Sequence, residues 1–286
     1  MLIVGGLIAG AIALLTVDSG DAQSPAPTPK VNQFDGNRAW AELVREVNAG
    51  PRPAGSAALR TLAARLRTTL PNGRFEAVTG GLQNVVGVLP GRRPAIVLAA
   101  HYDTKDTPAG FVGANDGAGG TAVVLEAARV LRRSAPANPR EIRFVLFDGE
   151  ESPKGCDAFL TCGIRGSRAY AARHAKELKA LVLADFVANR NLSLKRDQGS
   201  DVALWAQFRA AAKVAGVGAI VSSAEQGAVE DDHTPFMQAG VPAIDLIDFD
   251  FPQWHTLQDR PDVLSKRSLD AAGEAVVALM RTLRLH

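Results

Sequence analysis

Apolar segments of strand length alternate with helical segments along most of this chain, and this alternation restricts the folds it can adopt. The later strands are predicted at 94–104, 142–151, 180–188 and 242–250, and the helices that follow them at 121–134, 167–179, 202–217 and 268–285. Continuous apolar strands are typical of a parallel sheet whose two faces are both covered by helices. We therefore expect an α/β fold, a three-layer sandwich with a central, mostly parallel mixed sheet.

The segments before this pattern contain two helices and two strands, predicted at 35–50, 56–70, 74–79 and 83–91. Further upstream, Leu2 to Val17 is apolar and is followed by small residues at Gly20 and Ala22. This pattern predicts a signal peptide at residues 1–22, with an uncleaved membrane anchor as the alternative. Either interpretation places the protein outside the cytoplasm, exported to the periplasm or secreted. The Pro-rich residues 23–36 are expected to be a linker, and 37–286 a single domain.

The net charge of +2 is spread over a chain with 47% hydrophobic and 22% charged residues, and it forms no basic stripe. This composition predicts a globular protein without a nucleic-acid partner. We expect a monomer that touches a membrane only through its N-terminal segment, if that segment is uncleaved. The two cysteines, Cys156 and Cys162, are expected to form a short-loop disulfide, because exported proteins meet an oxidising environment.

Polar side chains follow the predicted strands at the ends where a parallel sheet forms its ligand crevice. His101, Glu150, Glu151 and Asp185 all lie at such ends. Strands often end in polar turns, but this does not explain acids at almost every carboxyl end with histidines among them. The sequence therefore predicts that the site lies at this edge of the sheet.

The candidate metal ligands at this edge are histidines with neighbouring acids, which zinc accepts as nitrogen and oxygen ligands. Three of the five histidines, His101, His233 and His255, have carboxylates beside them. Asp116 lies in the glycine-rich segment "GANDGAGG", which has neither the spacing nor the lysine of a phosphate-binding loop. The adjacent Glu150 and Glu151 can divide two tasks, one binding the metal while the other moves a proton.

These motifs together resemble the zinc-dependent exopeptidase superfamily, which contains aminopeptidases and glutaminyl cyclases. The segments that carry the resemblance, from residue 37 to the C-terminus, are "GPRPAGS", "NVVGVLPG", "HYDT", "GANDGAGG", "FDGEES", "GSRAYA", "DDHTPF", "AGVPAI" and "WHTLQD". The resemblance implies that residues 37–286 are one catalytic domain that acts on peptide or protein N-termini. It also implies that one zinc ion, or two, is bound at the carboxyl ends of the strands.

The residue roles follow from the same resemblance. It makes Asp116, Glu151 and His255 the ligands of the retained zinc and Glu150 the general acid/base. In the two-zinc aminopeptidases a second zinc is held by the counterparts of His101 and Asp185, with Asp116 as the bridge. Both of these positions carry ligands in this chain, so the resemblance leaves the number of zinc ions at one or two.

Several details are similar to the glutaminyl cyclase branch in particular. They are "HYDTK", the doubled acid of "DDHTPF", and Phe251 and Trp254 just before His255. In cyclases the matching aromatic residues wall the substrate pocket, while carboxylates at the positions of Asp185 and Asp231 form a network of acids. The animal cyclases carry a further aromatic pocket residue after the paired glutamates, where this chain has only Phe159.

The resemblance therefore implies cyclisation of N-terminal glutamine to pyroglutamate, with release of ammonia. The alternative is a zinc aminopeptidase, in which the same residues activate water to cut the first peptide bond. A third alternative is an inactive binding ectodomain on the same fold. This last class predicts a missing ligand or base, and none is missing.

Overall fold

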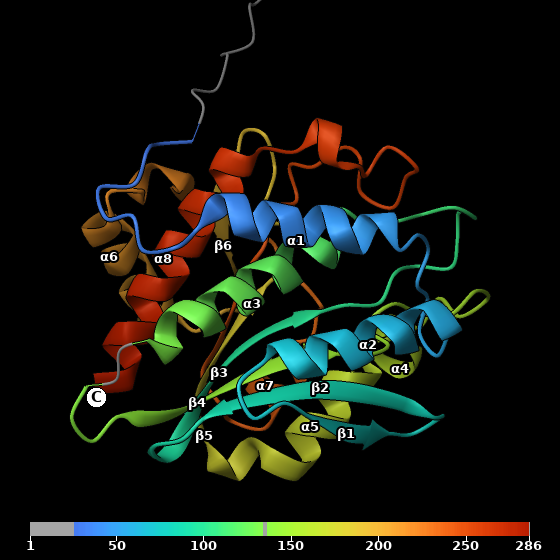
Figure 1. Cartoon of the computed structure of the whole chain (residues 1–286), viewed down its shortest axis with the longest axis horizontal. Coiled ribbons are helices and arrows are strands. Elements are labelled where there is room, and N and C mark those ends of the chain that lie inside the picture. The colour runs from blue at the N-terminus through green and yellow to red at the C-terminus, as the bar shows by residue number, and fades with distance from the viewer. Residues whose placement is uncertain (1–25, 134–135, 286) are drawn as a thin grey trace, which may run out of the picture.

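The computed structural model describes residues 26–133 and 136–285. The predicted signal peptide or anchor at 1–22 lies outside these residues. Among the described helices, none combines the length and the apolar character that a membrane span needs. The sheet and the helices around it are drawn in Figure 1.

A mixed sheet with the strand order β1-β2-β4-β3-β5-β8 forms the middle layer. Its strands are β1 (Arg74–Val78), β2 (Leu82–Leu89), β3 (Arg92–His101), β4 (Arg140–Phe147), β5 (Leu178–Ala184) and β8 (Ala243–Leu246). The pairs β4–β3, β3–β5 and β5–β8 are parallel, and β1–β2 and β2–β4 are antiparallel. The predicted mostly parallel mixed sheet is therefore confirmed.

Helices cover both faces of this sheet, because successive strand residues point to opposite sides. In β3, Ile96 and Leu98 face one core, and Val97 and Ala99 face the other. The first core is completed by α1 (Gly36–Asn48), α2 (Ala57–Thr69), α3 (Ala118–Arg132), α6 (Val202–Ala215) and α8 (Lys266–Leu285). The second is completed by α5 (Arg165–His174) and α7 (Thr234–Gln238). The predicted three layers are thus confirmed.

Local sequence signals explain where several of these helices begin and end. Asp35, Ser56 and Asp201 cap α1, α2 and α6, each accepting a hydrogen bond from the backbone N–H three residues later. Gly216 ends α6 with a positive φ of 82°, a conformation that costs glycine least. The helix that the sequence predicts at 268–285 begins slightly earlier, at Lys266.

A two-stranded parallel sheet, β6 (Leu194–Asp197) and β7 (Val221–Gln226), lies outside the main sheet and was not predicted. Neither strand has the apolar run that identifies a buried strand, and β7 has no fully buried residue. The short helices α4 (Phe159–Cys162) and α7 also escaped prediction, because four or five residues are too few for a hydrophobic period to emerge. The remaining helical turns are 3-10 segments at Ala175–Glu177, Gly218–Ile220 and Pro261–Val263.

The described end of the predicted linker packs against α8. Phe34 is fully buried, and its ring occupies the space that a side chain at Gly273 would need. The Phe34 backbone N–H donates to the Glu274 carboxylate at 2.8 Å. The residues just before α1 are therefore bound to the domain by both packing and hydrogen bonding.

An ionisable side chain, Glu46, lies in the core between α1 and the loop that follows it. Its nearest cation is Arg52, also fully buried, with Nη2 at 3.9 Å from Glu46 Oε2. Burial raises the pKa of Glu46 from its ordinary value of 4.5 to about 8. At neutral pH the folded protein therefore keeps a proton that the unfolded chain releases.

We expect Glu46→Gln to gain stability relative to the wild type as the pH rises from about 5 to 8. In this window the unfolded wild type loses a proton that the folded state retains. The free energy of unfolding of the wild type therefore falls by up to about 1.4 kcal/mol for each unit by which the pH rises. Glutamine does not titrate. Urea unfolding at pH 5 and pH 8 measures the difference, with exposed Glu225→Gln as the control. Parallel pH profiles for the wild type and Glu46→Gln would contradict the buried, protonated state.

Candidate metal centre and its cavity

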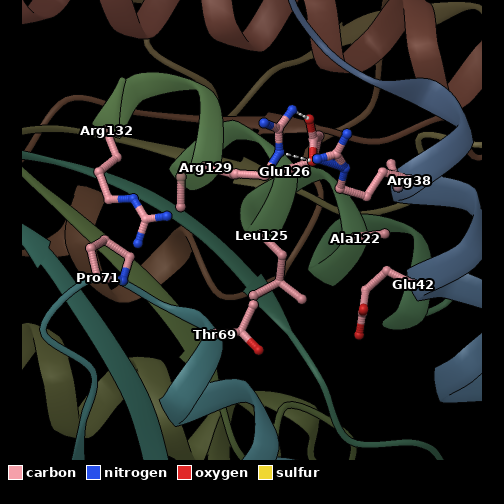
Figure 2. Close-up of a pocket in the computed structure, with 11 residues that line it drawn as sticks. Arg38, Glu42, Thr69, Pro71, Ala122, Leu125, Glu126, Arg129 and Arg132 are labelled. Carbon is pink, nitrogen blue, oxygen red and sulfur yellow. Dashed lines mark hydrogen bonds and ion pairs between the residues drawn. The ribbon is translucent and has the colours of Figure 1, made fainter. Parts of the chain in front are cut away.

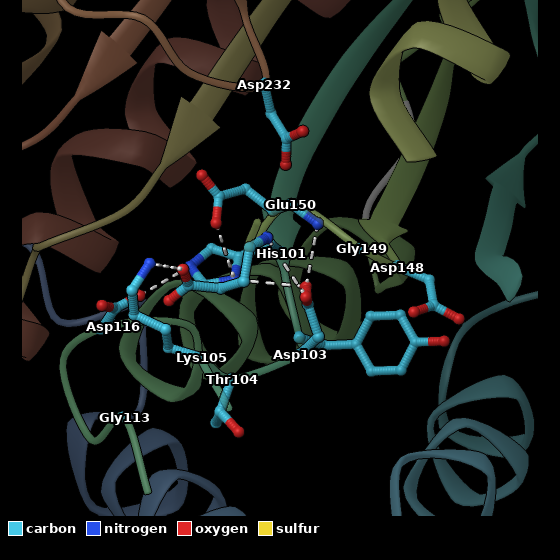
Figure 3. Close-up of polar contacts among 12 residues, drawn as sticks. His101, Asp103, Thr104, Lys105, Gly113, Asp116, Asp148, Gly149, Glu150 and Asp232 are labelled. Carbon is cyan, nitrogen blue, oxygen red and sulfur yellow. Dashed lines mark hydrogen bonds and ion pairs between the residues drawn. The ribbon is translucent and has the colours of Figure 1, made fainter. Parts of the chain in front are cut away.

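The predicted site residues come from different strands but meet at one edge of the sheet. His101 is the last residue of β3, Glu150 and Glu151 follow the end of β4, and Asp185 follows β5 directly. Because these strands are parallel, their carboxyl ends lie side by side. Asp116 reaches the same place from the loop that leads into α3, as Figure 3 shows.

Two groups of potential ligands share Asp116. One contains His101, Asp116 and Asp185, and the other contains Asp116, Glu151 and His255, with ligand atoms within 4.8 Å of one another in each group. Asp116 Oδ1 lies 3.2 Å from His101 Nε2, and its Oδ2 lies 3.5 Å from His255 Nε2. The two oxygens of one carboxylate thus face different groups, so Asp116 could bridge two cations.

Several buried atoms of these groups have no hydrogen-bond partner within the described residues. They include both ring nitrogens of His101, Asp116 Oδ2, Glu151 Oε1 and Asp185 Oδ1. Buried polar atoms nearly always make hydrogen bonds, so a convergent set of nitrogens and oxygens with ionic contacts but no hydrogen bonds needs a reason. Imidazole nitrogen with carboxylate oxygen is a donor set that zinc accepts, and three protein ligands leave one position open for substrate. The residues of this site therefore fit a catalytic cation.

Asp259 and Gly117 shape the loop that carries Asp116. The Asp259 carboxylate accepts from the backbone N–H groups of Asn115 at 2.8 Å and of Asp116 at 3.1 Å. Gly117 has a φ of 96°, and a Cβ on it would lie 3.1 Å from the His101 ring. A side chain at this position would be both strained and crowded, so glycine lets the loop approach His101.

Asp103 joins the paired glutamates to the segment after β3. Its carboxylate accepts from the backbone N–H groups of Glu150 and Glu151, each at 3.2 Å. The same carboxylate lies 3.6 Å from His101 Nδ1 (Figure 3). A single side chain thereby positions both glutamates and one ring nitrogen of the histidine.

The neighbours Glu150 and Glu151 have opposite electrostatic surroundings. Burial raises the pKa of Glu150 well above its usual range, and the Glu151 charge raises it further. Burial also acts on Glu151, but His255 and Lys105 outweigh it and lower the pKa of that carboxyl. The distances are 3.5 Å to His255 Nε2 and 3.2 Å to Lys105 Nζ. Environments that separate two carboxyl pKa values are typical of an acid/base paired with an ionised partner.

More acids lie behind Glu150. Burial raises the pKa values of Asp185, Asp231, Asp232 and Asp245. His233, from the same motif as Asp231, is fully buried and lies 3.7 Å from Asp197 and 4.0 Å from Asp245, apart from both ligand groups. When acids are buried this close together, some of them keep their protons, because a full set of neighbouring negative charges would be unfavourable.

A cavity of about 730 Å³ opens beside these groups. Its polar lining includes Asp116, Glu150, Glu151, Asp185, Asp231 and His255, and its aromatic lining consists of Phe159, Phe186, Phe249 and Trp254. The Trp254 ring centre lies 4.3 Å from that of His255 and 5.4 Å from that of Phe249. A pocket with apolar walls and a few convergent polar groups is the usual form of a small-ligand site.

The two aromatic residues expected at this pocket occupy different places. Trp254 lines the cavity and is 45% exposed, so a ligand can reach it. Phe251 is 4% exposed and belongs to the main core, with its ring 6.0 Å from Phe186. Phe249, two residues earlier, lines the cavity instead.

A second cavity, of about 200 Å³, lies between α1 and α3 (Figure 2). Arg38 and Arg129 there both pair with Glu126. The residues that line it include no histidine and none of the ligands above. Two of its three arginines share one acidic partner and its lining has no imidazole, so it offers no comparable chemistry.

The structure also contains the expected disulfide between Cys156 and Cys162, which is confirmed. The residues that sequence reasoning missed are Lys105, Phe186, Asp232, Asp245, Phe249 and Asp259. Lys105, Asp232 and Asp259 stand inside quoted motifs and could have been found there. Asp245 could not, because an acid within a strand gives no signal of a buried partner.

Comparison with known proteins identifies the family of this chain. Residues 84–280 match Peptidase family M28. The chain belongs to this family. The expectation of an enzyme in the zinc-dependent exopeptidase superfamily is therefore confirmed.

Two relatives carry the names of an aminopeptidase and of a glutaminyl cyclase. Aminopeptidase YwaD of Bacillus subtilis is 33% identical over 215 residues, which cover 68% of this chain and 43% of the relative. The glutaminyl-peptide cyclotransferase of Bothrops jararaca is 29% identical over 237 residues, covering 65% of this chain and 61% of the relative. This chain thus spans less than two thirds of either relative.

Solved structures match over nearly their whole length. A glutaminyl cyclase from an Acidobacteriales bacterium has a TM-score of 0.77 and 31% identity, covering 92% of this chain and 98% of the other. The glutaminyl cyclase of Porphyromonas gingivalis also gives 0.77, at 26% identity, with coverage of 88% and 100%. A zinc-dependent exopeptidase from Parabacteroides distasonis gives 0.75 at 23% identity, which supports the fold alone.

We expect Asp116→Asn to lower metal affinity more than Glu151→Gln does, because Asp116 belongs to both ligand groups. Each loss should exceed the roughly 10–100-fold that follows removal of an outer partner. Equilibrium dialysis against zinc, followed by elemental analysis, measures the affinity and stoichiometry. Exposed Asp262→Asn is the control. Wild-type metal content in Asp116→Asn would contradict the assignment.

Proposed function

We propose that this protein is a zinc-dependent glutaminyl-peptide cyclotransferase-like enzyme that converts N-terminal glutamine to pyroglutamate and releases ammonia. The observation that carries the proposal is Trp254, whose exposed ring lies beside His255 and forms a wall of the cavity with Phe249. Such a wall suits the methylene groups of a glutamine side chain whose carbonyl points at the ligand groups. The near-complete overlap with the Acidobacteriales glutaminyl cyclase supports the same choice.

In this proposal Asp116, Glu151 and His255 hold the zinc ion. His101 and Asp185, which face the other oxygen of Asp116, would hold a second ion if the protein binds two. When bound, zinc supplies Lewis-acid polarisation of the γ-carbonyl group of the substrate. The ionised state of Glu151, favoured by His255 and Lys105, is the state that a metal ligand needs.

Glu150 is the proposed general acid/base. It takes a proton from the α-amine as the amine nitrogen attacks the γ-carbonyl carbon, and it returns this proton to the departing ammonia. A carboxyl whose pKa is raised by burial is a stronger base than an ordinary glutamate and still a useful acid near neutral pH. Asp185 and Asp231, which line the same cavity, would orient Glu150 and the leaving nitrogen through hydrogen bonds.

The second candidate is an aminopeptidase, which the similarity to Aminopeptidase YwaD favours. The presence of both ligand groups around Asp116 also suits a two-metal peptidase. In that reaction Glu150 would deprotonate water for attack on the first peptide bond. The parts are shared, and only the nucleophile differs. A binding ectodomain without activity would need no intact base, and Glu150 is in place.

The proposed substrates are the N-termini of peptides or proteins, met outside the cytoplasm by a monomeric enzyme. The Cys156–Cys162 disulfide supports export, since disulfides persist mainly in oxidising compartments. A similar structure from Bacteroides thetaiotaomicron, 25% identical, is a leucine aminopeptidase precursor, which agrees with an exported family member.

We expect the purified, zinc-loaded protein to release ammonia from Gln-Ala-Ala without cutting the peptide. Leu-Ala-Ala serves as the matched substrate, because it has a comparable size but no γ-amide. Ammonia is measured by a coupled assay, and peptide products are measured by mass spectrometry. Faster release of free leucine than of ammonia would identify the aminopeptidase alternative.

We expect Glu150→Gln to lower kcat by roughly 10²–10⁴-fold, the usual contribution of a general acid/base. Its zinc content should stay near that of the wild type, because the proposed ligand is the neighbouring Glu151. Elemental analysis beside steady-state kinetics separates the two roles. Loss of zinc with Glu150→Gln, and retention with Glu151→Gln, would reverse the assignment of the pair.

A further inference from the structure

The segment between the paired glutamates and α5, residues 152–163, forms a closed loop at the edge of the cavity; we call it the Cys loop. It begins directly after Glu151 and ends beside the paired glutamates, where the Ile164 N–H donates to the Glu150 carbonyl at 2.8 Å. The Arg165 N–H likewise donates to the Gly149 carbonyl at 2.9 Å. Both ends of the loop are therefore attached to the proposed acid/base and its flanking residues.

Phe159 is the one residue of the Cys loop that lines the cavity. It begins α4, a single helical turn, labelled in Figure 1, that ends at Cys162. Its ring lies against Gly163, where an added Cβ would be 2.8 Å from the ring and 2.7 Å from the Glu150 carbonyl oxygen. A larger residue at 163 would displace the ring, so this glycine lets Phe159 approach the glutamates.

Packing alone gives the Cys loop little support. The helix α4 has no fully buried residue, and Asp157, Ala158 and Thr161 are exposed. A single helical turn is unstable on its own in water, because it fixes several backbone angles for very few hydrogen bonds. Arg168 supports the end of this turn by donating to the carbonyl groups of Leu160 at 2.7 Å and Thr161 at 2.8 Å. The disulfide between Cys156 and Cys162 closes the loop around Phe159 and restricts the conformations open to it. The disulfide thus acts on a residue that lines the cavity.

The other aromatic residues of the cavity do not depend on this loop. Phe186, Phe249 and Trp254 contact one another in a chain of ring contacts, with centre distances of 5.5 and 5.4 Å. Within the described residues, Phe159 makes no ring contact with any of them. Its position therefore depends on the loop that carries it.

We propose that the Cys156–Cys162 disulfide controls substrate affinity by holding the Phe159 ring at the cavity wall, where the ring can contact the apolar part of the substrate. The inference rests on the proposed function in one respect, that the peptide substrate occupies this cavity. It does not depend on whether the substrate is cyclised or hydrolysed. The disulfide is accordingly a positioning element for substrate binding, in addition to any effect on stability.

The test is a double-mutant cycle of Phe159→Ala, the paired change Cys156→Ser with Cys162→Ser, and all three changes together. Serine variants avoid chemical reductants, which can also bind zinc. KM and kcat are measured with whichever of Gln-Ala-Ala and Leu-Ala-Ala the wild type turns over. Leu160→Ala is the matched control, because Leu160 lies on the same turn but does not line the cavity.

We expect Phe159→Ala to raise KM about 3- to 10-fold, as loss of an aromatic contact does, with kcat and zinc content unchanged. The paired serine variant should raise KM to a similar extent, and the triple variant should add no further increase. Phe159→Tyr should restore a KM near that of the wild type. Leu160→Ala should leave it unchanged.

Three results would overturn the inference. An unchanged KM in Phe159→Ala would remove the residue from substrate binding. An equal rise in Leu160→Ala would indicate general disturbance of the loop. If the two increases in KM multiply in the triple variant, the disulfide and Phe159 act independently.

If neither peptide is turned over, calorimetric binding of both peptides replaces KM. Absence of binding as well as turnover would contradict the proposed function and this inference together, whereas an unchanged KM with turnover contradicts the inference alone.

Discussion

Negative charge buried at one edge of the sheet is the constraint on which the rest of this structure depends. The acids gathered there are Asp103, Asp116, Glu150, Glu151, Asp185, Asp231, Asp232 and Asp245, all buried. Removing so many carboxyl groups from water opposes folding unless protons, cations or hydrogen-bond donors compensate. The raised pKa values of the acids behind Glu150 are one form of compensation, and the convergence of two ligand groups on Asp116 provides for another.

Hydrogen bonds between buried side chains and the backbone hold these acids in place. Arg52, from the "GPRPAGS" segment, is fully buried and donates to the carbonyl groups of Tyr102, Val112 and Gly113. It thereby connects the segment after His101 to the loop that carries Asp116, and it places a positive charge beneath the acids. Asp103 and Asp259 act in the opposite sense, as acceptors for backbone N–H groups of the paired glutamates and of the Asp116 loop, respectively. The segments that carry the ligands are thus fixed by side chains distant in sequence.

Topology predicts only the part of the proposed ligand set that stands at strand ends, whereas Asp116 and His255, which lie in loops, were assigned through the family resemblance. Once the strands are known to be parallel, residues at their carboxyl ends must meet, which brings His101, Glu151 and Asp185 together. The aromatic wall could not be predicted in the same way. Phe249 and Phe251 lie two residues apart in an irregular segment, where no regular alternation fixes which ring faces the cavity. The small sheet of β6 and β7 was missed for a related reason, since exposed polar strands lack an apolar pattern.

Charge and shape are therefore carried by different parts of this site. The proposed ligands and the acid/base lie at strand ends or in loops tied to them by buried hydrogen bonds. The apolar walls come from the Cys loop and from the segment around Trp254, both of which are more exposed. A cyclase and an aminopeptidase need the same arrangement of carboxylates, imidazoles and cations but different space for the substrate. Under the proposed function, a change in these walls would alter which nucleophile reaches the carbonyl group while the acids at the edge of the sheet stay in place. The choice between water and the substrate's own amine would then depend on the apolar walls formed by Trp254 and Phe159.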